Sequence, residues 1–274
     1  MTRTDGVGGH ARPAIDTTQA SPARMYDYYL DGKDNYPVDR TAGEAVLEAV
    51  PHLRSAALAN RRWLYRVVRY LAENGITQFL DIGTGIPTTP NTHQIAQAVH
   101  PEARVVYVDN DPIVMAYARA LLSSGPEGRT GYIEADLREP ERILADEELW
   151  EVLDRSRPVA LLLVAVLHFV EDSSDPLGIV GRLMDALPSG SFLAVSHATG
   201  DFGPEAWNKV VEIYRSQGNA AQVRSRDEVA GFFSGLDLVE PGLDLVSRWR
   251  PPDERTSRIR AEEVACYGGL GRKP

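Results

Sequence analysis

The chain has 274 residues, of which 43% are hydrophobic and 25% are charged, and this balance is typical of a globular protein and excludes wholesale disorder. Its net charge of −10 argues against a general nucleic-acid binder, because neutralising phosphate groups requires a basic surface. The longest apolar run, residues 159–167, is too short for a membrane span of about 20 residues, and a single cysteine, Cys266, excludes an internal disulfide bond and a thiolate zinc site.

The N-terminal part of the chain predicts a polar lead-in followed by helices. Residues 1–20 lack the apolar stretch of a signal peptide and are expected to be disordered, which favours a cytoplasmic protein. Residues 21–75 are expected to form a helical extension. Its helices are predicted at residues 22–30, 38–49 and 52–74. A polar break at residues 31–35 separates the first two helices, and Gly75 ends the third.

From residue 76 to residue 274, short apolar segments alternate with helical ones. Strands are predicted at residues 78–82, 104–108, 130–134, 159–164, 191–196, 236–239 or 243–249, and 263–267; helices are predicted at residues 91–99, 112–122, 140–145, 177–187 and 225–233. This alternation predicts an α/β domain, a doubly wound and mostly parallel sheet with helices on both faces. The strand at 159–164 is apolar throughout, which is typical of a central strand. Because such sheets bind ligands at the carboxyl ends of their strands, we expect the site there.

A glycine-bearing turn follows the first strand of this domain. Gly83 and Gly85 allow a tight turn and a close approach of the backbone to a ligand. A dinucleotide site favours a third glycine where this chain has Thr88, and Pro87 removes an amide donor. Asp81 would repel a pyrophosphate but would suit the ammonium and sulfonium groups of S-adenosylmethionine. The turn therefore favours S-adenosylmethionine over NAD; a tight turn without a ligand is the alternative.

Carboxylates also stand at the ends of the next two strands. Asp109 lies roughly 20 residues beyond the glycine turn, where an acidic residue accepts hydrogen bonds from ribose hydroxyls. Asn110 is expected along the adenine edge, and Asp111 is expected to cap the following helix. Asp136, after the third strand, can accept a hydrogen bond from the adenine amine. The alternatives are a solvated aspartate for Asp109 and a helix cap for Asp136.

Two histidines are candidates for a general base. His168 follows the central strand, where a transferred group would lie, and is the better candidate by position. His197, at the end of the fifth strand, is the second candidate. A structural or surface role is the alternative, because a single histidine more often has one.

Several segments of the chain match a known family pattern. They are residues 26–36, the Asp81 turn with its continuation to residues 91–93, and residues 107–112, 160–170 and 239–242. Together they resemble Rossmann-like, class I S-adenosylmethionine-dependent methyltransferases. More closely, they resemble the bacterial S-adenosyl methyltransferase family, formerly a domain of unknown function. The resemblance covers nearly the whole chain from Pro22 onward.

The resemblance implies a seven-stranded sheet whose last strand runs antiparallel, with S-adenosylmethionine as the cofactor and S-adenosylhomocysteine as the product. It implies that the glycine turn lines the methionyl part, that Asp109 holds the ribose, and that Asp136 and Leu137 frame the adenine. The expected cofactor-binding residues are Asp81, Gly83, Thr84, Gly85, Asn91, Thr92, Asp109, Asn110, Asp136, Leu137, Ala165, Tyr28, Lys33 and Asn35. The methyl acceptors of the family are largely unassigned, so no catalytic set is carried over.

The segment 26–36 also has a physical interpretation. Its tyrosines and polar residues are grouped around Gly32. As a lid over the cofactor, the segment would place Lys33 or Asn35 on the methionyl carboxylate and use its tyrosines to exclude water. The alternative is a packed helix pair joined by a polar turn.

Three functions remain in competition. Methyl transfer to a small or medium-sized acceptor is favoured, because it depends more on positioning than on a catalytic dyad. An NAD(P)-dependent oxidoreductase is disfavoured by Asp81, Pro87 and Thr88, and by the lack of a Tyr-x-x-x-Lys pair after the fourth or fifth strand. A non-catalytic S-adenosylmethionine sensor is the third. We expect a small-molecule acceptor, no nucleic acid and no membrane partner; the oligomeric state stays open, with a homodimer among the options.

Overall fold

The computed structural model describes residues 17–274, so the predicted lead-in, residues 1–20, lies mostly outside the described residues. The strands are β1 (Gln78–Ile82), β2 (Arg104–Asp109), β3 (Arg129–Glu134), β4 (Ala160–Val164), β5 (Phe192–Ala198), β6 (Asp237–Leu238), β7 (Asp244–Leu245) and β8 (Cys266–Arg272). The helices are α1 (Pro22–Tyr29), α2 (Pro37–Ala49), α3 (Leu53–Glu73), α4 (Thr92–Gln97), α5 (Pro112–Leu121), α6 (Pro140–Ala145), α7 (Glu147–Val152), α8 (Pro176–Asp185), α9 (Pro204–Ser216), α10 (Arg226–Gly231), α11 (Glu254–Ser257) and α12 (Ala261–Val264), with short 3₁₀ helices η1 (Leu167–Phe169) and η2 (Asp172–Ser174) after β4. Within residues 17–274, no helix combines the length and apolarity that crossing a membrane requires.

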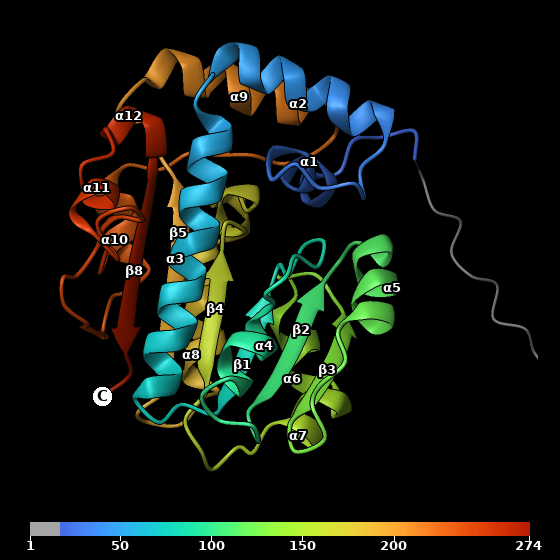
Figure 1. Cartoon of the computed structure of the whole chain (residues 1–274), viewed down its shortest axis with the longest axis vertical. Helices are drawn as coiled ribbons and strands as arrows, with labels where there is room; N and C mark the ends of the chain where they lie inside the picture. Colours follow the sequence, from blue (N-terminus) through green and yellow to red (C-terminus); the bar gives the residue numbers. More distant parts are fainter. Residues whose placement is uncertain (1–16) are drawn as a thin grey trace, which may run out of the picture.

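The strands form one sheet in the order β3-β2-β1-β4-β5-β8-β6, with β7 also paired to β8 (Figure 1). Strands β1 to β5 pair in parallel, and β8 pairs antiparallel with β5. The predicted doubly wound, mostly parallel sheet with an antiparallel last strand is confirmed. It has eight strands instead of seven because both alternative C-terminal strands form, and β6 and β7 pair with different parts of β8.

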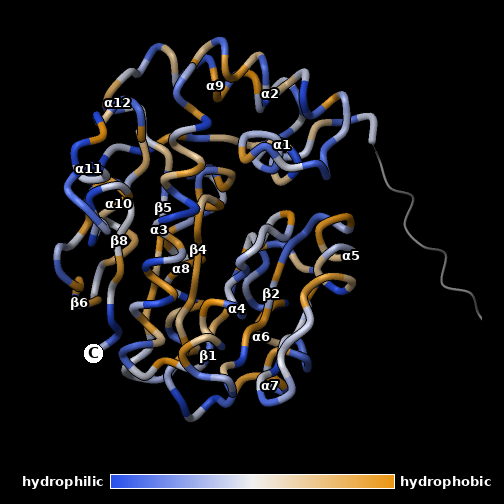
Figure 2. Tube along the Cα trace, viewed as in Figure 1, coloured by the Kyte–Doolittle hydropathy of each residue, from blue (hydrophilic) through white to orange (hydrophobic). Residues whose placement is uncertain are grey.

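Alternate side chains of the central strand enter two different cores. In β4, Leu161 and Leu163 pack in one cluster with residues of α6, α7 and α8, whereas Ala160 and Leu162 pack in another with residues of α3 and α5. Figure 2 shows β4 as hydrophobic along its length. Because both faces of β4 are covered, it lacks the alternation of polar and apolar residues that is typical of a strand with one exposed face. The predicted central strand at 159–164 is confirmed.

A third hydrophobic core lies over the carboxyl ends of the parallel strands, where α1, α2 and α9 form a separate layer (Figure 1). Met25 of α1 and Val46 of α2 pack in one cluster with Trp207, Val210 and Tyr214 of α9. Helices α7, α9, α11 and α12 were not among the predicted elements. The i, i+3, i+7 spacing of the three α9 residues is the signal that predicts a buried helix face. This layer brings the N-terminal helices to the ligand-binding edge of the sheet.

The last strand lies further along the chain than predicted, because α12 and the residues after it occupy most of the predicted range 263–267. Its sequence is rich in glycine, which is depleted in strands and hides the strand signal. The glycines let neighbouring side chains approach the backbone. A Cβ on Gly268 would lie 2.8 Å from the Trp63 side chain, and a Cβ on Gly271 would lie 2.9 Å from that of Phe233. Close packing of side chains on β8 therefore stabilises the strand despite the low strand propensity of its glycines.

Candidate functional site

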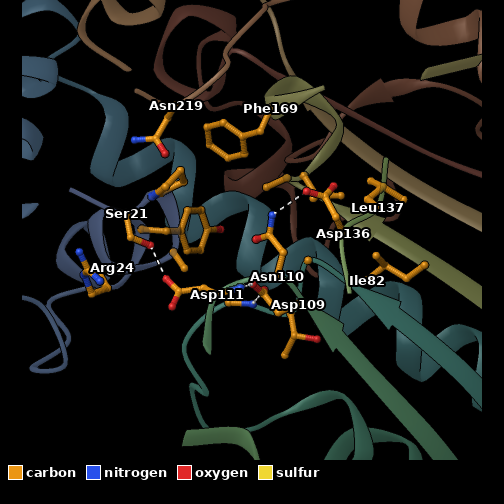
Figure 3. Close-up of a pocket in the computed structure, with 18 of the residues that line it drawn as sticks. Ser21, Arg24, Ile82, Asp109, Asn110, Asp111, Asp136, Leu137, Phe169 and Asn219 are labelled. Carbon is orange, nitrogen blue, oxygen red and sulfur yellow. Dashed lines mark hydrogen bonds between the residues drawn. The ribbon is translucent and has the colours of Figure 1, made fainter. Parts of the chain in front are cut away.

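A pocket of about 550 Å³ lies at the carboxyl ends of β1 to β4. Its floor consists of residues that end or follow these strands, and residues 19–24 and 218–220 contribute to its rim (Figure 3). Its volume falls in the range of small-molecule and cofactor sites, about 300–1,000 Å³. Nine of the predicted cofactor-binding residues line it: Asp81, Gly83, Thr84, Gly85, Asp109, Asn110, Asp136, Leu137 and Ala165.

The turn after β1 depends on two glycines. Gly83 has φ 76° and Gly85 has φ 66°, in the left-handed region that favours glycine. The backbone N–H of Gly83 donates to the carbonyl of Val108 at 2.8 Å. A Cβ on Gly83 would lie 2.5 Å from the Val166 side chain, whereas nothing lies within 4 Å of a Cβ on Gly85. Gly83 therefore permits close packing against the loop after β4, and Gly85 faces open space.

This difference predicts unequal effects of two alanine substitutions. Gly83→Ala combines left-handed strain of about 1–2 kcal/mol with overpacking of about 1–3 kcal/mol. Gly85→Ala carries only the strain. We expect denaturant unfolding to show the larger loss of stability for Gly83→Ala, with Gly85→Ala as the matched control. Equal losses in the two variants would show that Val166 yields at no cost.

Asp81 is a buried carboxylate at the end of β1. Burial raises its pKa to about 6, although the hydrogen bond from Thr92 and the charge of Arg61 oppose the shift. The Thr92 hydroxyl donates to Asp81 Oδ2 at 2.7 Å, and Asn91 Oδ1 accepts from the backbone N–H of Thr88 at 3.0 Å. Thr92 and Asn91 do not line the pocket. They lie behind the turn and hold its carboxylate and backbone in place.

Asp109 ends β2 with both carboxylate oxygens already hydrogen-bonded. Oδ2 accepts from the backbone N–H of Gly85 at 2.9 Å, and Oδ1 accepts from that of Asp111 at 3.0 Å. Burial raises the pKa of Asp109 to about 6, while these backbone donors oppose the shift. Asp111 caps α5 as predicted, accepting from Ile113 N at 2.8 Å. It also accepts from the Ser21 hydroxyl at 2.8 Å, which ties the N-terminal segment to the pocket floor (Figure 3).

Asp136, after β3, is the carboxylate of the pocket whose pKa is lowered. Asn110 Nδ2 donates to Asp136 Oδ2 at 3.1 Å (Figure 3). Desolvation by itself would raise the pKa of Asp136, but the hydrogen bonds from Arg138 and Asn110 outweigh it and lower the pKa to about 2. The buried side chain of Leu137 lines the pocket beside it. A planar, apolar group with an amine donor fits this end of the pocket.

The predicted lid residues Tyr28, Lys33 and Asn35 do not line the pocket. Asn35 Nδ2 donates to Asp27 Oδ2 at 2.8 Å, and the backbone N–H of Asp34 donates to the same oxygen at 3.0 Å. Lys33 is exposed, and the Tyr28 hydroxyl donates to the carboxylate of Glu44 at the surface. The polar turn therefore wraps around the buried carboxylate of Asp27 in α1, as in the alternative of a packed helix pair joined by a polar turn.

Other residues of the N-terminal helices line the pocket instead. The lining residues that were not predicted as cofactor-binding include Ser21, Arg24 and Tyr26 around α1, Asn60 and Arg61 of α3, and Asn219 after α9. Arg61 is held by hydrogen bonds to the carbonyls of Thr88 and Pro90. Asn60 and Arg61 are adjacent polar residues within the amphipathic helix α3, and this is the sequence signal for them. Asn219 reaches the site only through the folding of α9.

The two histidines lie outside this pocket. His197 Nδ1 donates to the carbonyl of Ala198 at 2.7 Å, and Nε2 accepts from Arg224 at 2.9 Å, which leaves neither nitrogen free. Burial, with the charge of Arg224, lowers the pKa of His197 to about 3. His168 lines a smaller cavity beside the pocket. Burial, with His197 and Arg224 nearby, lowers its pKa well below the usual range, so the ring is neutral. Its role as a general base stays a prediction.

The family model and two solved structures each match nearly the full length of this chain. The family model described as S-adenosyl methyltransferase matches residues 8–274. A solved DUF574 family protein from Streptomyces avermitilis MA-4680 is 52% identical with a TM-score of 0.92, and the match covers 95% of this chain and 100% of that one. A protein from Thermobifida fusca YX, provisionally described as a methyltransferase, is 40% identical with a TM-score of 0.87, covering 95% and 97%. No curated protein matches the chain.

A more distant structure shares the fold alone. Magnesium protoporphyrin IX methyltransferase from Synechocystis PCC 6803, solved with bound SAH, is 13% identical with a TM-score of 0.54. The match covers 91% of this chain and 93% of that one. Because the match covers most of both chains, the strand order described above is that of a class I methyltransferase fold.

Proposed function

The chain belongs to the S-adenosyl methyltransferase family, and on that premise we propose that it transfers the methyl group of S-adenosylmethionine to a small-molecule acceptor. The observation that carries the proposal is the placement of Asp81, Asp109 and Asp136. They follow or end β1, β2 and β3, and all three line one pocket together with the glycine turn. Three carboxylates suit a ligand with an ammonium group, ribose hydroxyls and an exocyclic amine.

The pocket chemistry supports a specific orientation of the cofactor. Asp109 would accept from the ribose hydroxyls, and Asp136 with Leu137 would hold the adenine. Asp81 would face the methionyl ammonium group across the glycine turn. Arg61, which lines the same end, would pair with the methionyl carboxylate. The pyrophosphate of NAD would meet these carboxylates as a like charge, which disfavours an oxidoreductase.

The bound cofactor supplies an electrophilic methyl group on a sulfonium. The contribution of the chain is to position that group and to exclude water. Ala165 and Phe169, after β4, line the pocket on the side facing β5. Ser21, Arg24 and Tyr26 close the pocket from the N-terminal side. This role for the N-terminal helices keeps the lid interpretation but assigns it to other residues than Lys33 and Asn35.

Calorimetric titration with S-adenosylmethionine, S-adenosylhomocysteine and NADH tests the cofactor. We expect the first two to bind and NADH to give no heat of binding, because the carboxylates favour a ligand with an ammonium group and repel a pyrophosphate. Binding of NADH without binding of S-adenosylmethionine would reverse the assignment of the cofactor. Incubating the protein with a cell extract and labelled S-adenosylmethionine then separates an enzyme from a sensor. Labelled products are expected, and cofactor binding without any labelling would favour the sensor.

A further inference from the structure

A second cavity, which we call the inner cavity, adjoins the cofactor pocket. It has a volume of about 80 Å³ and shares Tyr26, Asn60, Ala165 and Phe169 with the larger pocket. Ala165 and Phe169 follow β4, so the two spaces meet at the end of the central strand. Phe169 projects into the larger pocket in Figure 3. A molecule in the inner cavity therefore lies beside whatever occupies the cofactor pocket.

The lining of the inner cavity is uncharged. None of its lining residues among residues 17–274 is an aspartate, glutamate, lysine or arginine, in contrast to the carboxylates and arginines of the larger pocket. Apolar side chains such as Trp207 and Val210 of α9 form much of the wall. The one titratable imidazole, His168, is neutral because burial lowers its pKa. A carboxylate, phosphate or ammonium group entering this space would lose its hydration without gaining a counter-charge.

One hydroxyl group in this wall, that of Tyr29, is not fully hydrogen-bonded. The hydroxyl of Tyr29 is buried and makes no hydrogen bond of normal geometry within residues 17–274; its polar neighbour is the hydroxyl of Tyr214, which also lines the cavity. Tyr29 is 4% exposed, and burial raises its pKa, so the group remains a neutral O–H. Leaving such a group unpaired is unfavourable, and native proteins rarely do so without a reason. The neighbouring Tyr26 hydroxyl, by contrast, donates to the carbonyl of Ala57 at 3.0 Å and accepts from Asn60 at 2.9 Å.

We propose that the inner cavity binds the methyl acceptor and that the part of the acceptor lying there is small, uncharged and mostly apolar, with one hydrogen-bonding group that pairs with the Tyr29 hydroxyl. This inference rests on the proposed function, because it assumes that the larger pocket holds the methyl donor. The volume of about 80 Å³ is about half the roughly 150 Å³ of a dry cavity that admits benzene, so the inserted part consists of only a few non-hydrogen atoms.

The test uses two matched probes on the full-length protein saturated with S-adenosylhomocysteine. Isobutanol is a branched, neutral molecule with one hydroxyl, and isobutyrate has the same carbon skeleton with a carboxylate. Ligand-observed saturation-transfer NMR is expected to detect isobutanol and not isobutyrate. In Tyr29→Phe, the affinity for isobutanol is expected to fall about fivefold, because one neutral hydrogen bond is lost.

Thermal unfolding of the free protein supplies an independent readout. Tyr29→Phe is expected to leave the Tm unchanged or raise it, because the deleted hydroxyl makes no hydrogen bond of normal geometry. The matched control, Tyr26→Phe, is expected to lower the Tm, because it deletes a hydroxyl with two partners. A lower Tm for Tyr29→Phe, equal binding of the two probes, or unchanged isobutanol affinity in Tyr29→Phe would overturn the inference.

The cofactor titration distinguishes this failure from that of the proposed function. If S-adenosylhomocysteine binds and isobutanol does not, the acceptor site is refuted while the cofactor assignment stands. If neither S-adenosylmethionine nor S-adenosylhomocysteine binds, the proposed function fails, and binding of isobutanol alone would refute the acceptor role of the inner cavity as well.

Discussion

Replacing Asp39 by alanine is expected to lower the free energy of unfolding by roughly 3–5 kcal/mol, the loss typical when one partner of a buried ion pair is removed. Asp39 is fully buried, and its Oδ2 lies 2.8 Å from Nε of Arg24, which is 3% exposed. The same carboxylate accepts from the backbone N–H groups of Ser21 at 2.9 Å and Tyr36 at 2.8 Å. The substitution therefore leaves a buried guanidinium without its counter-charge and two backbone donors without their acceptor.

The measurement is denaturant unfolding, with Glu73→Ala as the matched control. Glu73 forms an ion pair with Arg69 at 2.8 Å, but both side chains are largely exposed. Surface pairs contribute about 0–1 kcal/mol, so the control is expected to unfold almost as the wild type does. Because Asp39 also holds Ser21 at the rim, weaker S-adenosylmethionine binding should accompany the loss of stability. If Asp39→Ala were no more destabilising than Glu73→Ala, the junction between α1 and α2 would not depend on this pair.

Replacing Asp109 by alanine is expected to weaken S-adenosylmethionine binding about 100-fold, because two hydrogen bonds to a charged group contribute roughly 1.5 kcal/mol each. The carboxylate lies at the end of β2 and lines the pocket floor. Its two oxygens already orient the turn through Gly85 and the start of α5 through Asp111. Calorimetric titration measures the affinity, and thermal unfolding checks that the variant remains folded.

The pH dependence of binding gives Asp109 a second, independent signature. Burial raises the pKa values of both Asp109 and Asp81 to about 6, so below this pH each carboxyl takes up a proton and can no longer serve as an anionic acceptor. Among the charged neighbours, Asp111 raises the pKa of Asp109 further and Arg61 lowers that of Asp81, but burial is the largest cause of both shifts. The affinity of the wild type should therefore fall as the pH is lowered below 6, by up to about 100-fold per pH unit when both groups must be ionised.

The matched variant for this profile is Asp109→Asn, which keeps an oxygen acceptor and removes the titration. Its affinity should fall only about tenfold per pH unit below pH 6, because Asp81 alone still titrates. Asp136 does not contribute in this range, since its pKa lies at about 2. A profile that is identical in the wild type and in Asp109→Asn would exclude an ionised Asp109 from cofactor binding.

Packing over long sequence separations produced the elements that local patterns missed. Helix α9 has its apolar residues at Trp207, Val210 and Tyr214, but its partners are in α1 and α2, more than half the chain away. In β8, glycine lowers the local strand propensity, and the strand forms because Trp63 and Phe233 pack onto its bare backbone. The apolar spacing of α9 is visible in a short window of sequence, but the partners on which α9 and β8 pack are not.

The sequence by itself determined the alternation of strands and helices and the carboxylates at the strand ends. Both follow from local causes: a buried parallel strand needs a continuous apolar run, and the residue after it is carried to the ligand-binding edge. Asp81, Asp109 and Asp136 could be placed in this way and do share one pocket. Their shared pocket is the observation that carries the proposed cofactor site.

Only the tertiary structure decided which N-terminal residues reach that pocket. Lys33 and Asn35 are the more distinctive residues in sequence, yet the buried carboxylate of Asp27 holds their turn away from the site, while Ser21 meets Asp111 across the rim. Which face of α1 turns toward the strand ends depends on its packing against α2, α3 and α9, and those contacts join segments far apart in the chain. The inner cavity arises in the same way, because α1, α3, α9 and β5 enclose a space that none of them specifies alone.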